Sequence, residues 1–112
     1  MGSTLGELEQ LLLMALLRRG GEASGIDLRE ELAERTGRSV LPGAVYTIME
    51  RLRERGLVTS FTGGATPERG GRRRKYYRMA PAGEEALAAA YRQVERMADG
   101  IADRLRAYWE ES

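Results

Sequence analysis

The sequence of 112 residues contains no cysteine and no histidine. It therefore lacks the usual zinc ligand sets, the Cys and His groups of nucleophilic catalysis, and any disulfide framework. Aromatic residues make up only 6% of the chain, and a chain of this length can bury one small core. We expect a single small protein that is not an enzyme and that needs no cofactor or metal.

Long apolar segments are also absent. The longest uninterrupted apolar run covers residues 11–17, far below the roughly 20 residues of a membrane span. The acidic residues Glu7 and Glu9 precede it, where a secretory signal would be basic. These features predict a cytoplasmic protein with no membrane partner.

The charge is distributed unevenly although the formal net charge is only +1. Residues 51–78 contain nine Arg and Lys residues and only two acidic ones, so the rest of the chain is net acidic. Such a basic block is typical of a protein that places one surface against a polyanion. The planar guanidinium of arginine suits phosphate oxygens, which favours phosphate binding over a merely solvated loop.

Hydrophobic spacing predicts three helices in the first half of the chain. The first covers residues 5–19, the second covers residues 25–36 behind a Ser24 cap, and the third covers residues 41–55 with Pro42 in its first turn. Two helices joined by a short link, the second of them amphipathic, fit a helix-turn-helix.

The third predicted helix has two different faces at 100° per residue. Its inward side is predicted to hold Leu41, Ala44, Val45, Ile48 and Leu52. Its outward side is predicted to hold Gly43, Tyr46, Thr47, Glu50 and Glu54. Polar groups near the start of such a helix suit contact with DNA. For Tyr46 we favour this contact over the alternative, packing of its ring on Glu50 or Arg51.

Two strands are predicted at residues 57–62 and 74–79, separated by a turn rich in Gly. Together they form a β-hairpin with a basic tip, a wing that can lie along phosphates or in a minor groove. Tyr76 and Tyr77 fall on opposite faces of the second strand, and the pattern does not decide which faces the core. The predicted DNA contacts outside the helix start are Arg51, Arg69, Arg72, Arg73, Lys75 and Tyr76.

A single long helix is predicted over residues 82–108, after Pro81. Apolar residues recur along it at alternating spacings of four and three, namely at Leu87, Tyr91, Val94, Ala98, Ile101, Leu105 and Tyr108. This spacing is typical of helices that pair lengthwise and predicts a dimer interface, with packing on the chain's own body as the alternative. The acidic residues Glu95, Asp99 and Asp103 are interpreted as a solvated stripe beside arginines rather than as a metal site.

Four segments carry a resemblance to a known family: residues 5–11, 44–47, 70–78 and 81–83. The most specific is Gly-Gly-Arg-Arg-Arg-Lys-Tyr-Tyr-Arg at 70–78. Over residues 4–105 the chain resembles short-tailed members of the PadR family of transcriptional regulators. The resemblance implies a homodimeric repressor that binds a palindromic operator in double-stranded DNA. It also implies that the third helix contacts the bases, the wing contacts the backbone and the last helix dimerises.

The resemblance further implies release from DNA by a small-molecule effector, bound at the dimer interface. The tryptophan that some short members use there corresponds to Val94, whereas Trp109 lies near the end of the chain.

The predicted fold is mainly α with a small β-hairpin. We expect a winged helix-turn-helix DNA-binding domain over residues 4–80 and a C-terminal dimerisation helix over residues 81–110. The alternative function is a protein-interaction adaptor that presents its basic face to an acidic partner. Glu50 and Glu54 on the predicted DNA side favour that alternative, because phosphates repel carboxylates.

Overall fold

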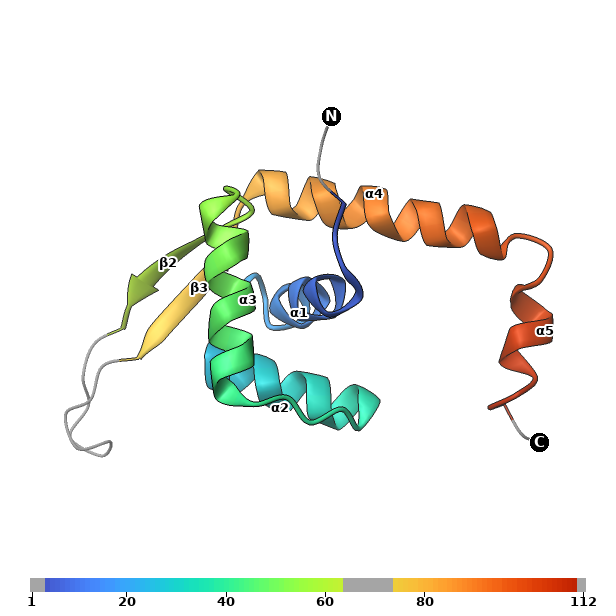
Figure 1. Ribbon diagram of the computed structural model, residues 1–112, viewed down its shortest axis with the longest axis horizontal. Coiled ribbons are helices and arrows are strands. Elements are labelled where there is room, and N and C mark those ends of the chain that lie inside the picture. Colours follow the sequence, from blue (N-terminus) through green and yellow to red (C-terminus); the bar gives the residue numbers. More distant parts are fainter. Residues whose placement is uncertain (1–3, 64–73, 111–112) are drawn as a thin grey trace.

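The computed structural model describes residues 4–63 and 74–110 (Figure 1). Its elements in chain order are α1 (Glu7–Arg18), β1 (Glu22–Ser24), α2 (Gly25–Thr36), α3 (Pro42–Glu54), β2 (Val58–Thr62), β3 (Lys75–Met79), α4 (Pro81–Ala98) and α5 (Ala102–Arg106). The predicted fold class, mainly helical with a small β-hairpin, is confirmed.

The sheet has three antiparallel strands in the order β1-β3-β2. The hairpin of β2 and β3 was predicted, and β1 was not. Strand β1 is too short to show an alternating pattern, and it pairs with the far edge of β3, with Ala23 opposite Tyr77. An ion pair between Arg78 and Glu22, 2.9 Å apart, crosses the same two strands. The returning strand of the hairpin is therefore the central strand of the sheet.

Helix α1 lies in the middle of the body, with α4 on one side and α2 on the other (Figure 1). Its residues Leu12, Leu13 and Leu16 are completely buried. Burial of each leucine side chain contributes about 1.5–3 kcal/mol of hydrophobic stabilisation. The wide apolar face of the first helix is thus used against several neighbours at once.

Helix α2 begins and ends where the sequence predicts. Ser24 Oγ accepts a hydrogen bond from the Asp27 backbone N–H at 3.1 Å, and Asp27 Oδ2 accepts one from the Ser24 N–H at 3.2 Å. The helix stops at Gly37, whose φ of 71° lies in the left-handed region that favours glycine. Both caps satisfy backbone groups that a helix end leaves free.

The inward face of α3 differs from the prediction. Val45, Met49 and Leu52 are buried, whereas Leu41 is 76% exposed and Ala44 is exposed. Leu41 is the residue before the helix and has extended backbone angles, so helical periodicity does not apply to it. The placement of Leu41 and Ala44 on the inward side was therefore wrong, and Met49 takes part in the core instead.

The prediction of one continuous C-terminal helix over residues 82–108 was also wrong. Helix α4 ends at Ala98, Asp99 has non-helical angles (φ −57°, ψ 126°), and Gly100 has a φ of +86°. A residue in the left-handed region cannot continue a right-handed helix, and glycine adopts that region without a Cβ penalty. Helix α5 therefore starts afresh and runs in another direction from α4 (Figure 1).

Candidate nucleic-acid interface

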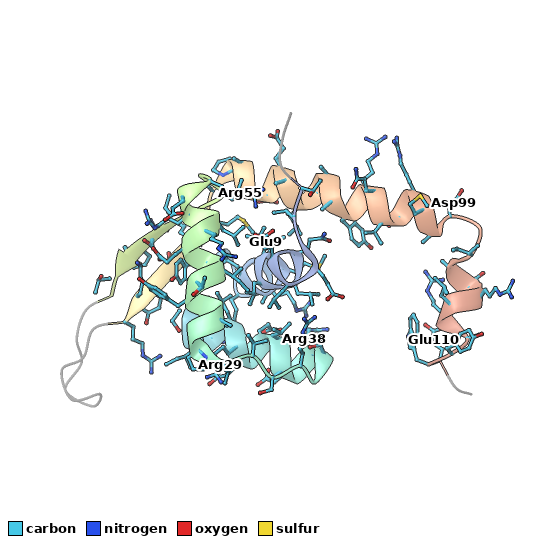
Figure 2. All side chains as sticks on the ribbon, viewed as in Figure 1. Glu9, Arg29, Arg38, Arg55, Asp99 and Glu110 are labelled. Carbon is cyan, nitrogen blue, oxygen red and sulfur yellow. The ribbon has the colours of Figure 1, made fainter. Side chains whose placement is uncertain are left out.

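Helix α3 is attached to the body at both ends by charged side chains (Figure 2). Before its start, Arg29 Nε of α2 donates to the carbonyl oxygen of Val40 at 2.7 Å. Just beyond its end, Arg55 Nη1 lies 3.5 Å from Glu9 Oε2 of α1. Hydrogen bonds to charged groups are stronger than those between neutral groups. The two attachments hold both ends of α3 against the body.

The residues predicted to contact DNA from this helix lie on its exposed side. Gly43, Thr47 and Arg51 are exposed, and Tyr46 is 55% exposed. A side chain added at Gly43 would meet no atom within 4 Å. The start of α3 thus presents an open surface with a phenol, a hydroxyl and, one turn further on, a guanidinium.

Lys75, at the start of β3, lies against this helix. Its ammonium nitrogen is 2.8 Å from Glu50 Oε2 and 5.4 Å from the centroid of the Tyr46 ring, a cation–π distance. Arg74 and Lys75 line a cleft of about 280 Å³ together with Pro42 and Tyr46. The structure therefore brings Tyr46 and Lys75 together, as a joint surface of helix and hairpin requires.

Glu50 does not lie on the open face of α3, so its predicted outward placement was wrong, whereas Glu54 is exposed as predicted. Its side chain is only 16% exposed. Besides Lys75 it accepts hydrogen bonds from Arg53 Nε at 3.0 Å and from the Tyr77 hydroxyl at 3.2 Å. These donors, Lys75 first, hold the pKa of Glu50 below its usual value although partial burial opposes them. Residue spacing places Glu50 at the border of the helix face, and only the position of β3 reveals its partners.

The two neighbouring tyrosines have different environments. Tyr77 is 2% exposed and belongs to the core. Its burial, and then the Glu50 carboxylate, raise the pKa of its hydroxyl above the usual value. Tyr76 is half-buried and stacks on Phe61 of β2, with ring centroids 5.4 Å apart. One ring face of Tyr76 is therefore occupied within the hairpin.

Three predicted DNA contacts, Arg69, Arg72 and Arg73, lie outside the described residues. Within residues 4–63 and 74–110, no cluster of three acidic side chains is suited to a metal ion. In the same part of the chain, no helix combines the length and the apolar character that a membrane crossing requires.

The residues predicted to form a dimer interface fall into two groups. Leu87 is 6% exposed and packs in the chain's own core, and Ala98 is half-buried. The others are 47–80% exposed and lie along α4 and α5 and just beyond, namely Tyr91, Val94, Ile101, Leu105 and Tyr108. Met97 and Trp109, which the heptad spacing does not include, are 81% and 67% exposed. Helices α4 and α5 and the residues next to them therefore expose more apolar side chains than those at the predicted heptad positions.

Together these features define a winged helix-turn-helix protein: an exposed third helix, its short link to the second, and a hairpin that lies against it. The family model described as the transcriptional regulator PadR-like family matches residues 12–89. The chain belongs to this family, and the predicted resemblance is confirmed.

Solved structures agree with this assignment. A PadR family transcriptional regulator from Eggerthella lenta is 29% identical, with a TM-score of 0.69, over 88% of this chain and 86% of that chain. Bacillus subtilis PadR in complex with operator DNA is 25% identical, with a TM-score of 0.62, over 74% of this chain and 45% of that one. A PadR family regulator from Clostridium difficile shares the fold at 21% identity and a TM-score of 0.68, over 89% and 98% of the two chains. The comparison with curated proteins gives no match.

Proposed function

We propose that the protein is a homodimeric, cytoplasmic repressor that binds a palindromic operator and is released by a small-molecule effector. The observation that carries the proposal is the exposed start of α3 beside the basic root of the hairpin, where Tyr46 and Lys75 meet. The similar structure of Bacillus subtilis PadR, solved with operator DNA, supports it. In this proposal residues 4–80 bind DNA and residues 81–110 hold two copies together.

The proposed contacts divide by chemistry. Tyr46 and Thr47, with close approach at Gly43, contact base edges in a major groove, where hydroxyl groups can donate or accept hydrogen bonds. Arg51 and Lys75 contact phosphates at the groove edge. The wing arginines extend these backbone contacts, which supply affinity without sequence information.

Dimerisation is proposed through the exposed apolar side chains of α4 and α5. Large exposed apolar surface on a small protein marks an interaction site, and Tyr91, Val94 and Leu105 are all about half exposed. The proposed dimer has its two α3 helices in successive major grooves, about 34–36 Å apart. A cleft of about 680 Å³ at the junction of α4 and α5 has the volume of a small-molecule site and is the proposed place of the effector.

The adaptor alternative depended on two glutamates facing the polyanion. Glu50 is engaged by Lys75, Arg53 and Tyr77, so only Glu54 remains on the exposed face. One of the two objections to DNA binding is therefore removed.

Salt dependence of DNA binding tests the proposed contacts. The probe is a duplex that the wild-type protein selects from a random pool, with affinity measured by fluorescence anisotropy. The double variant Arg72→Ala/Arg73→Ala should flatten the slope of log affinity against log salt by about 1.8, because each lost phosphate contact removes roughly 0.9. Arg104→Ala on α5 is the matched control and should leave the slope unchanged. Equal slopes for all three proteins would show that Arg72 and Arg73 do not contact the DNA phosphates.

Sedimentation tests the proposed dimer. Leu105→Glu places a charge in the apolar surface of α5 and should shift the protein toward a monomer. Arg104→Glu, at the adjacent position outside the predicted heptad, should remain dimeric. A wild-type protein that stays monomeric at tens of micromolar would refute the dimer.

A further inference from the structure

One carboxylate joins α3 to β3. Glu50 lies in the middle of α3, and its Oε2 accepts from Lys75 Nζ at 2.8 Å and from the Tyr77 hydroxyl at 3.2 Å, both on β3. Its Oε1 accepts from Arg53 Nε at 3.0 Å, one turn along the helix. Three donors from two elements therefore converge on a single, mostly buried side chain.

The negative charge of Glu50 is unfavourable for DNA binding at this position. It stands on the side of α3 that meets the hairpin, next to the surface proposed to bind phosphates, where a free negative charge would weaken binding. Three donors offset that charge and supply good hydrogen-bond geometry, whereas removing one partner of such a group leaves others unsatisfied. The hydrogen bonds of Glu50 therefore serve to fix the geometry of α3 and β3, because a carboxylate does not attract DNA.

We propose that Glu50 is a positioning residue that joins the recognition helix and the wing root into one rigid unit. In doing so it fixes where Lys75 meets the DNA backbone relative to the bases that α3 contacts. The inference rests on the proposed DNA-binding function. The contact between the Lys75 ammonium and the Tyr46 ring is a second restraint on the same lysine.

The consequence is a specificity role without any base contact. When Lys75 is fixed relative to α3, its ammonium reaches a phosphate only if α3 lies in the groove as it does on the preferred sequence. With Lys75 released, its ammonium can follow any phosphate, so arbitrary DNA gains a contact that the preferred duplex already has. The ratio of the two affinities should therefore fall.

The test compares Glu50→Gln with Glu54→Gln. Both remove one negative charge from α3, but Glu54 is exposed and forms no hydrogen bond or ion pair with the described residues. Affinities are measured for the duplex selected from a random pool by the wild-type protein and for a scrambled duplex of the same composition. We expect the ratio of these affinities to fall about tenfold in Glu50→Gln, a loss typical of one charge-assisted hydrogen bond. In Glu54→Gln the ratio should stay within about twofold of wild type.

A double-mutant cycle with Lys75→Met separates positioning from simple destabilisation. If Glu50 acts through Lys75, then Glu50→Gln has little further effect on the ratio in the Lys75→Met background. A purely structural defect would lower both affinities in parallel and leave the ratio unchanged. If Glu50 acted only by repelling phosphates, both affinities would rise, and by the same factor in Glu50→Gln as in Glu54→Gln. A parallel loss of both affinities or this equal gain would overturn the inference.

A measurement without DNA keeps this inference distinct from the proposed function. If the selection enriches no sequence, the DNA-binding proposal fails, and amide hydrogen exchange of the free protein then decides about Glu50. Faster exchange confined to β2 and β3 in Glu50→Gln, and absent in Glu54→Gln, would support the joining role. Identical exchange in wild type and Glu50→Gln would overturn it.

Discussion

Replacing Gly83 with alanine tests how closely α4 approaches the sheet. Gly83 is buried in the first turn of α4. A Cβ built on it would collide with the carbonyl group of Leu57 and would also press on the sulfur of Met79. Because the Leu57 oxygen belongs to the backbone, it cannot rotate away as a flexible side chain would. The start of α4 must therefore move if the methyl group is to fit.

The size of the effect follows from what that movement breaks. The Leu57 carbonyl accepts a hydrogen bond from the Ala80 N–H at 3.1 Å, whose net contribution is about 1 kcal/mol. Inserting a methyl group into a packed site costs about 1–3 kcal/mol, and the better helix propensity of alanine returns up to about 1 kcal/mol. We expect a net loss of about 2 kcal/mol in the free energy of unfolding, equivalent to a Tm lower by roughly 8 °C.

Urea denaturation at one fixed protein concentration measures this loss, since the apparent stability of an oligomer depends on concentration. Gly43→Ala is the control, because a Cβ at Gly43 meets nothing within 4 Å. Its stability should equal or slightly exceed that of wild type. A Gly83→Ala protein within about 0.5 kcal/mol of wild type, the range of ordinary surface substitutions, would show that the predicted collision does not occur.

Two further predictions concern ionisable groups. In the folded protein the pKa of Tyr77 lies above its usual value of 10.0, so as the pH rises above about 10 the unfolded chain loses this proton first and stability falls. Tyr77→Phe should therefore show a flatter loss of stability in alkaline urea titrations than Tyr76→Phe, and parallel curves would contradict the assignment. Arg19 Nε donates to Glu31 Oε1 at 2.9 Å at a partly exposed site. Arg19→Met should lower the Tm slightly at low salt and not at about 1 M salt, where exposed charges are screened, and a loss independent of salt would point to packing instead.

Much of the fold follows from local sequence features. The Ser24 cap, the Gly37 stop and Pro42 in the first turn of α3 each act on the backbone within a few residues. The hairpin strands likewise follow from β-branched and aromatic residues around a glycine-rich turn. These elements could be predicted because their causes are contained in short segments.

Other features could not be predicted from periodicity. Helical spacing shows that α3 has an apolar face but not its exact centre. Met49 is buried and Leu41 is exposed, because Leu41 lies before the helix with extended backbone angles. The heptad spacing continues across Gly100 although the backbone there turns away at a positive φ. A pattern of side chains carries no information about such a backbone angle.

By itself the sequence determined the first three helices, the basic hairpin and the family, because each depends on residue types that are close together along the chain. Tertiary structure alone decided that Tyr77 rather than Tyr76 enters the core. It also decided that Glu50 meets Lys75 instead of solvent. The physical reason is that these partners are about 25 residues apart, and a carboxylate takes the donors that folding brings within hydrogen-bond distance.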